Sequence, residues 1–232
     1  MRNTRLGPFA DVSRLTLGGG GLGQIWGESS EAEAVATVHA ALAAGINMID
    51  TAPSYGACEA VIASALRGVV PAGVRITTKC QLGTASVGSV ATKLEESLDA
   101  SLEAMRLDRV DLYFLHSNIC EDDTVYAHGN EYRAAFATPW SQYVEEVVPA
   151  FEDLERRGRI GAWGITGVGA RSRSFRRRRV PARLGSESAH PVRRGCPSAR
   201  KSSCLGSSAY DGRLSDRAST PTRRATLSDA PS

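Results

Sequence analysis

Three polar side chains stand directly after successive apolar runs of the sequence, at the points where each run is expected to end as a strand. They are Asp50 after residues 46–49, Lys79 after residues 74–78 and His116 after residues 112–115. The carboxyl ends of parallel strands gather on one face of a sheet or barrel, so these side chains, 29 and 37 positions apart, are expected to converge. Each alone is ordinary, but all three at matching strand ends indicate an active site.

Tyr55 is a fourth candidate, because it lies in the loop after Asp50, where Gly56 favours a turn. A phenol has a pKa of about 10 and is a poor proton donor at neutral pH, but a nearby ammonium lowers that pKa. We expect Lys79 to supply the ammonium, Asp50 to hold it by a salt bridge, and His116 to hydrogen-bond a carbonyl oxygen. Such a set suits proton delivery to an oxygen that gains charge, as carbonyl reduction by hydride requires.

The elements that must position these residues follow from hydrophobic periodicity. From residue 13 to 165 short apolar runs alternate with longer amphipathic ones, which is typical of βα units on a parallel sheet. A capping box, Ser30 with Glu33, predicts the start of the first helix, and Gly45 predicts its end. The predicted strands are residues 13–17, 46–49, 74–78, 110–115 and 160–165, and further helices are predicted over residues 59–66, 94–105 and 143–157.

The connection over residues 117–139 is longer than usual by more than twofold and is typical of a lid or specificity loop. Its polar residues Glu121, Asp122, Asp123 and His128 suggest metal ligands only weakly, because no recognised ligand spacing is present. We interpret them as solvated loop residues and predict no metal site.

The candidate residues lie in three segments, Asp50-Thr-Ala-Pro-Ser-Tyr55-Gly56, Ile76-Thr-Thr-Lys79 and Asp111-Leu-Tyr-Phe-Leu-His116. In order and spacing, over about residues 5–169, the sequence resembles the aldo-keto reductases, which are (β/α)8 barrels that use NADPH and less often NADH. The resemblance implies a cytoplasmic oxidoreductase that reduces the carbonyl of a small aldehyde or ketone to an alcohol, with Tyr55 as the general acid. It leaves the identity of the carbonyl substrate and the oligomeric state open.

The resemblance also implies where cofactor and substrate lie. Gly20, Gly21 and Leu22, together with Asp50, are expected near the nicotinamide. Thr166 is expected to hold its carboxamide, because Gly164-Ile-Thr166-Gly167 resembles a Gly-Val-Ser-Asn segment of the family, with glycine in place of the asparagine.

The substrate is expected between Tyr55, His116 and a wall formed by Trp26, although a packing role for this tryptophan is equally compatible with the sequence.

A competing motif is Gly18-Gly-Gly20-Gly-Leu-Gly23, which satisfies the dinucleotide fingerprint of the Rossmann fold. That fingerprint must open a helix directly, so that the pyrophosphate meets the helix N-terminus. Here the predicted helix cap, Ser30, comes seven residues after Gly23. We therefore discount the match.

The net charge of +3 is the sum of two unlike parts. Residues 1–170 carry 13 basic and 21 acidic side chains, a net charge of −8, whereas residues 171–232 carry 15 and 4, a net charge of +11. The second part is rich in Arg, Ser and Pro with isolated apolar residues, so we expect it to be disordered. We predict a partial barrel over residues 1–170 and a low-complexity basic tail over residues 171–232.

Five predicted strands are fewer than the eight of a complete (β/α)8 barrel, so the α/β fold is expected to be incomplete. In the resembled family the last three units hold the rest of the cofactor, and we expect little or no reductase activity. Our hypothesis is a reading-frame shift near codon 170, because out-of-frame GC-rich codons yield Arg, Ser and Pro. Translating the DNA beyond codon 165 in the other two frames tests it, and the absence of strand-helix alternation in both would reject it.

A rival interpretation is a non-catalytic fragment whose Arg-rich tail binds nucleic acid nonspecifically. It is disfavoured because the tail offers only Phe175 and Tyr210 for stacking on bases. No apolar run approaches the roughly 18 residues of a membrane span, and the N-terminus lacks the apolar core of a signal peptide. Five widely spaced cysteines without a Cys-x-x-Cys favour reduced thiols in the cytoplasm.

Overall fold

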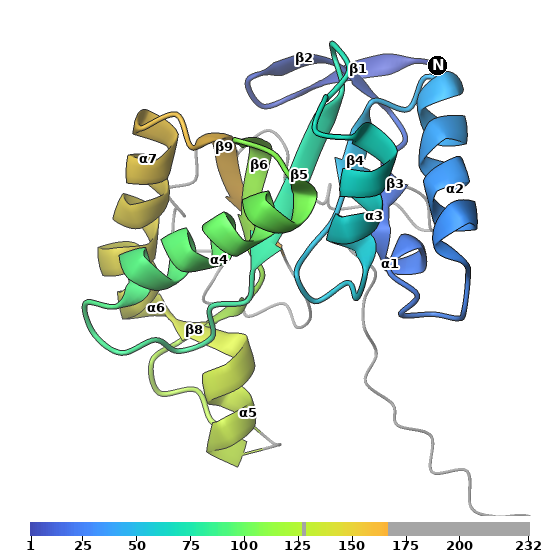
Figure 1. Ribbon diagram of the computed structural model, residues 1–232. Coiled ribbons are helices and arrows are strands. Elements are labelled where there is room, and N and C mark those ends of the chain that lie inside the picture. Colours follow the sequence, from blue (N-terminus) through green and yellow to red (C-terminus); the bar gives the residue numbers. More distant parts are fainter. Residues whose placement is uncertain (127–128, 167–232) are drawn as a thin grey trace, which may run out of the picture.

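The structure, a computed structural model, describes residues 1–126 and 129–166 of the 232-residue chain (Figure 1). Its centre is a five-stranded parallel sheet with the order β3-β4-β5-β6-β9. The strands are β3 (Leu17–Gly18), β4 (Met48–Asp50), β5 (Arg75–Cys80), β6 (Val110–Leu115) and β9 (Ile160–Ile165). The order has no reversal, as in the wall of a barrel and unlike a doubly wound sheet.

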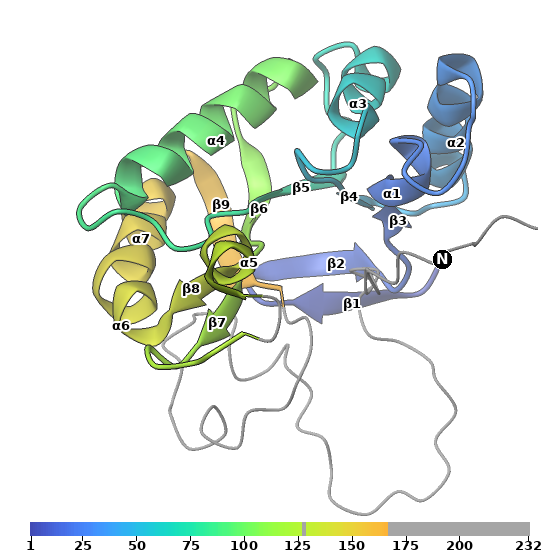
Figure 2. The same ribbon diagram turned by 90° about the horizontal axis from the view of Figure 1, so that it is seen from below.

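Helices cover one face of this sheet. Seen from the carboxyl ends of the strands, the sheet is an arc with the larger helices on its convex side (Figure 2). They are α2 (Glu31–Ala43), α3 (Cys58–Leu66), α4 (Val90–Met105) and α7 (Val148–Arg156), and α7 continues from α6 (Trp140–Gln142) and a π-helical turn over Tyr143–Val147. Each of the strands β3, β4, β5 and β6 therefore leads into a helix that packs back on the outer face, as the alternation in the sequence predicts.

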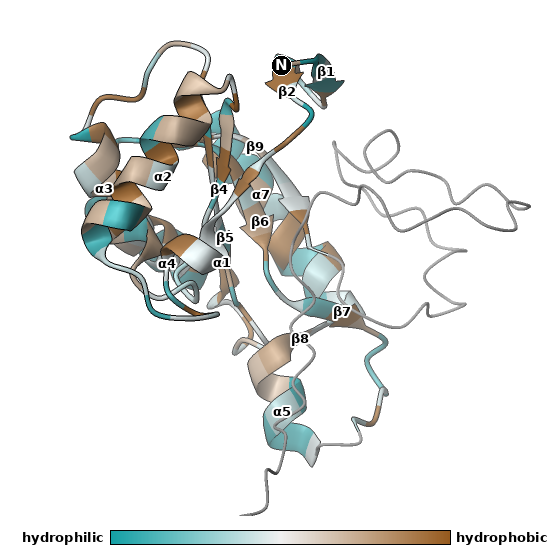
Figure 3. Ribbon diagram, turned by 90° about the vertical axis from the view of Figure 1, so that its right-hand side faces the viewer, coloured by the Kyte–Doolittle hydropathy of each residue, from teal (hydrophilic) through white to brown (hydrophobic). Residues whose placement is uncertain are grey.

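The outer core lies between sheet and helices. Trp163 of β9 stacks on Phe151 of α7 at 5.2 Å between ring centroids, and Tyr113 of β6 contacts the same ring at 5.4 Å. The Tyr113 hydroxyl donates to the carbonyl of Leu94 in α4 at 2.9 Å. Brown apolar colour covers most of β4 and β6, while teal marks stretches of α3 and of α5 (Gly129–Phe136) (Figure 3). Burial of these apolar faces fixes the strand register on which the site depends.

An antiparallel hairpin, β1 (Asn3–Leu6) and β2 (Phe9–Ser13), lies at the amino ends of the strands (Figure 1). Val12 packs with Met48, Leu112 and Ala162 in a second, smaller core on the inner face of the sheet. The expectation of a strand over residues 13–17 was wrong, because Ser13 ends β2 and the sheet strand begins only at Leu17. The hairpin turn at Gly7, which has a φ of 56°, separates two short strands that alternation alone did not reveal.

The long connection after β6 is more ordered than a simple loop. It contains β7 (Asn118–Cys120) and β8 (Ala137–Pro139), which pair in parallel, and helix α5 between them. Asp122 accepts hydrogen bonds from the backbone and side chain of Ser141 at 3.0 and 3.1 Å, so it caps the start of α6. His128 lies outside the described residues.

The other predicted elements agree with the structure to within a few residues, except that the helix expected over residues 143–157 is broken by the π turn. The capping box of Ser30 and Glu33 is confirmed, and Gly45 has a φ of 85°, as a helix-ending glycine requires. Cys58, Cys80 and Cys120 are free thiols. No helix among the described residues is both long and apolar enough to span a membrane. The basic tail over 171–232, with Cys196 and Cys204, lies outside the described residues.

Candidate active site

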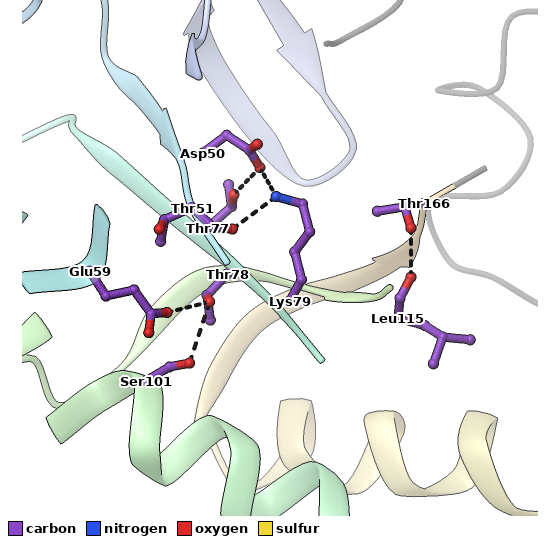
Figure 4. Close-up of polar contacts among 9 residues, drawn as sticks. All are labelled: Asp50, Thr51, Glu59, Thr77, Thr78, Lys79, Ser101, Leu115 and Thr166. Atoms are coloured by element: carbon purple, nitrogen blue, oxygen red, sulfur yellow. Dashed lines mark hydrogen bonds and ion pairs between the residues drawn. The ribbon is translucent and has the colours of Figure 1, made fainter. Parts of the chain in front are cut away.

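Asp50, Tyr55, Lys79 and His116 meet at the carboxyl ends of β4, β5 and β6. Lys79 is the buried centre of the group, with 1% of its surface exposed. Its ammonium donates to Asp50 Oδ1 at 2.7 Å and to the carbonyl of Thr51 at 2.8 Å (Figure 4). The hydroxyl of Thr77 donates to the same carboxylate oxygen at 2.8 Å. The salt bridge expected between Asp50 and Lys79 is therefore present.

Tyr55 lies against this ion pair. Lys79 Nζ stands 4.5 Å from the centroid of the Tyr55 ring, and the imidazole of His116 meets that ring edge to face at 6.2 Å between centroids. The turn that carries Tyr55 is closed by its own amide, which donates to the carbonyl of Ala52 at 2.9 Å. Gly56 has a φ of 54°, as the predicted turn needs. The structure thus brings together the four residues proposed as catalytic.

Burial shifts the pKa values of Tyr55, Lys79 and His116. It raises the pKa of Tyr55 to about 12, with further contributions from the charges of Asp50 and Cys58. The expectation of a lowered pKa was wrong in its net direction, because burial and the negative charge of Asp50 both act against the phenolate. Burial lowers the pKa of Lys79, against the opposing effect of Asp50, and it lowers the pKa of His116, helped by the positive charge of Lys79.

The glycines after β3 allow the Tyr55 loop to approach closely. A Cβ atom on Gly19 would lie 2.5 Å from the carbonyl oxygen of Asp50, and one on Gly23 would lie 1.6 Å from that of Tyr55. A Cβ atom on Gly56 would in turn lie 2.2 Å from the carbonyl oxygen of Gly23. Backbone packing explains these glycines, which agrees with the decision to discount the dinucleotide fingerprint. The helix within this glycine segment, α1 (Gly19–Leu22), has a single turn.

Residues expected to hold a nicotinamide lie near the same rim. Gly20 and Leu22 are buried in α1, whereas Gly21 is exposed. Trp26 is 61% exposed, and its indole covers Gly20, since a Cβ atom there would lie 2.7 Å from the ring. Thr166 directly follows β9, and its hydroxyl donates to the carbonyl of Leu115 at 3.1 Å (Figure 4). With its proton so engaged, the half-buried Thr166 oxygen remains an acceptor for an amide, which fits a carboxamide.

Sequence reasoning missed a buried polar cluster on the other side of β5. Thr78 Oγ1 donates to Glu59 Oε1 of α3 at 2.8 Å and lies 3.5 Å from Ser101 Oγ of α4 (Figure 4). Glu59 follows the Tyr55 loop and resembles an ordinary acidic residue of a helix start, so its burial could not be seen. The residue that could have indicated this cluster in the sequence was Thr78, a polar residue directly before Lys79.

Known proteins share this sequence pattern and this fold. The sequence profile of the aldo/keto reductase family matches residues 14–174. The chain belongs to the aldo/keto reductase family. It is 32% identical over 161 residues to L-galactose dehydrogenase of Arabidopsis thaliana and 28% identical over 180 residues to NADH-specific methylglyoxal reductase of Escherichia coli. Each match covers 68% of this chain, but 45% and 49% of those relatives, so the chain spans about half their length.

Solved structures agree with the barrel assignment. An aldo-keto reductase from Pseudomonas aeruginosa superimposes with a TM-score of 0.53 at 29% sequence identity, covering 71% of this chain and 58% of its own. The prediction of an α/β barrel of βα units is confirmed over this part of the chain. As an aldo/keto reductase, the chain belongs to a family of oxidoreductases that act on small carbonyl compounds and typically depend on NAD(P)H.

Proposed function

We propose that the site of Asp50, Tyr55, Lys79 and His116 reduces the carbonyl of a small aldehyde or ketone to an alcohol. One observation carries the proposal: Lys79 is bound to Asp50 at 2.7 Å while its ammonium stands 4.5 Å from the centre of the Tyr55 ring. The pair places a phenol, a fixed cation and an imidazole at one rim of the sheet. Family membership supports assigning this arrangement to carbonyl reduction.

Tyr55 is the proton donor in this proposal. With a pKa of about 12 the phenol keeps its proton at neutral pH and releases it only to an oxygen that is becoming an alkoxide. Lys79 then faces the negative charge left on Tyr55, and Asp50 keeps the lysine in place. His116, whose pKa is lowered, is neutral at pH 7 and donates one ring N–H to the carbonyl oxygen, which orients the substrate.

A nicotinamide cofactor supplies the hydride when bound. Thr166 and the segment of Gly20, Gly21 and Leu22 are the residues that would hold the nicotinamide end. We propose NADPH as the cofactor, with NADH as the alternative, since one relative of this chain is named an NADH-specific reductase. Trp26, exposed beside Gly20, would form one wall of the substrate pocket.

The test measures oxidation of NADPH and of NADH by the purified full chain with a panel of aldehydes and ketones. We expect turnover that Tyr55→Phe lowers by about 10²–10⁴-fold, because the phenol is the acid. Oxidation that persists unchanged in Tyr55→Phe would reject the site. Absence of both turnover and cofactor binding in the wild-type chain would reject the assignment of this activity to the chain.

A further inference from the structure

Glu59 is an acidic side chain in the apolar layer between the sheet and its helices. Only 8% of its surface is exposed, although it lies in the first turn of α3. Its carboxylate accepts a hydrogen bond from Thr78 Oγ1 at 2.8 Å, and Thr78 is itself fully buried. Burying a carboxylate is costly, and an apolar side chain would join the same helix to the same strand more cheaply. The burial of Glu59 therefore indicates a role other than packing.

Thr78 connects this carboxylate to the candidate active site. Side chains alternate along a strand, so Thr78 points toward the helices while the next residue, Lys79, points toward Asp50 (Figure 4). A hydrogen bond that holds Thr78 in place also holds the adjacent backbone of β5. It therefore fixes the position and direction from which the Lys79 side chain leaves the strand.

The other end of the connection leads to Tyr55. The amide of Cys58, the first residue of α3, donates to the carbonyl of Tyr55 at 3.1 Å, and Glu59 is the next residue. The Glu59–Thr78 hydrogen bond thus joins the segment that carries the phenol to the strand that carries the ammonium. Ser101 of α4, 3.5 Å from Thr78 Oγ1 and 1% exposed, closes the cluster from a third element.

The charge of Glu59 also reaches Lys79. Burial lowers the pKa of this lysine, and Asp50, then Cys58 and last Glu59 act to raise it. Two further titratable groups face Lys79: Tyr55, whose ring centroid lies 4.5 Å from Nζ, and His116, whose pKa the charge of Lys79 helps to lower. A carboxylate behind the strand therefore helps to keep the ammonium protonated in a site with little water.

We propose that Glu59 is a positioning residue for the proton donor, because it holds the strand of Lys79 against the helix that follows the Tyr55 loop and places a compensating charge behind that strand. The inference rests on the proposed function, in which Tyr55 and Lys79 act together. It predicts two separable effects, one on geometry and one on charge.

The experiment uses the full-length chain with isotopically labelled lysine and tyrosine, and two readouts by NMR: the titration midpoint of Lys79 and the Overhauser contact between Lys79 and the Tyr55 ring. Glu59→Gln keeps an acceptor for Thr78 but removes the charge, so it lowers the Lys79 midpoint and preserves the contact. Thr78→Val removes the hydrogen bond, so it weakens the contact and lowers kcat roughly tenfold with KM little changed.

Two controls accompany these variants. Ser64→Ala removes a hydroxyl–carboxylate hydrogen bond of 2.7 Å from the same helix, on the side that faces Glu31, and should change neither readout. Thr78→Ser keeps the hydroxyl and should behave as the wild type. If Thr78→Val does not fold, the Lys79 midpoint in Glu59→Gln still decides the proposal.

The outcomes separate the two proposals. An unchanged Lys79 midpoint in Glu59→Gln, or an unchanged contact in folded Thr78→Val, overturns the role of Glu59 whatever the kinetics. Both NMR changes, together with turnover that Tyr55→Phe leaves unaffected, support the positioning role and reject the proposed function.

Discussion

Strand β5 carries two ion pairs, one near each end, and they differ in what surrounds them. At the amino end Arg75 Nη1 lies 3.1 Å from Asp111 Oδ1, and at the carboxyl end Lys79 Nζ lies 2.7 Å from Asp50 Oδ1. Residues 75 and 79 are four apart, so alternation directs both side chains to the same face of the sheet. The Arg75 side chain is 33% exposed, whereas that of Lys79 is 2% exposed.

The surroundings explain the difference. The guanidinium of Arg75 lies 5.2 Å from the centroid of the Phe9 ring in the hairpin, and the second oxygen of Asp111 accepts from the backbone of Ile76 at 3.0 Å. Phe9, Asp111 and Ile76, the partners at this end, all lie outside the candidate active site. At the other end Lys79 faces Tyr55, a titratable group that can exchange a proton. In the proposed function only the carboxyl end of the strand takes part in chemistry, as is common in barrels, whereas the pair at the amino end serves the fold alone.

The largest expected effect on stability comes from breaking the buried pair. Lys79→Met keeps the length of the side chain but leaves the carboxylate of Asp50, which is 14% exposed, without its cation. Leaving a buried charge unpaired costs about 3–5 kcal/mol, so urea denaturation should show a loss of that size. Asp50→Asn combined with Lys79→Met should recover part of the loss. A single variant as stable as the wild type would contradict the burial of this pair.

Gly23→Ala is expected to be the next most damaging change. Its Cβ atom would lie 1.6 Å from the carbonyl oxygen of Tyr55, and neither backbone segment can yield cheaply. We expect a loss of about 1–3 kcal/mol in the free energy of unfolding and a displaced Tyr55 loop. Gly18→Ala is the matched control, because a Cβ atom there meets nothing within 4 Å. Equal stability of the two variants would show that close approach does not explain Gly23.

The carboxyl end was the more predictable of the two. Strands β6 and β9 have the predicted bounds, because buried apolar runs such as that of Val110–Leu115 have a clear beginning and end. The presence of polar residues directly after such runs was enough to predict that Asp50, Lys79 and His116 lie close together. A residue at the end of a predicted strand must lie at the edge of the sheet, so its place there can be predicted from the sequence.

The amino end and the helix layer were less predictable. The hairpin strands have only four and five residues, too few for periodicity to distinguish them from a loop. The burial of Glu59 depends on how α3 packs on Thr78, which is a tertiary property. The pKa of Tyr55 was predicted in the wrong direction for the same reason, since burial and the Asp50 charge act only in the folded chain.

A smaller effect is expected from Arg75→Met at the amino end. The pair with Asp111 is partly exposed and its charges are screened by solvent, so the variant should lose about 1 kcal/mol in urea denaturation. The titration of Tyr55, followed as the absorbance difference between each protein and its Tyr55→Phe form, should stay at a pH of about 12. A shifted Tyr55 midpoint would mean that the two ends of β5 are coupled, and would contradict a purely structural role for the pair at the amino end.

The smallest expected effect is on the pH dependence of stability, and it comes from His116 at the carboxyl end of the sheet. The pKa of His116 in the folded chain is lowered from its ordinary value of about 6.5, so the folded state binds fewer protons than the unfolded state as the pH falls below that value. The stability contribution is therefore complete above pH ~6.5 and is lost as the pH falls toward the folded pKa. Urea midpoints measured between neutral and mildly acidic pH should decline less in His116→Gln than in the wild type. Identical declines would place the acid-sensitive group elsewhere and leave His116 as exposed to protonation as a free imidazole.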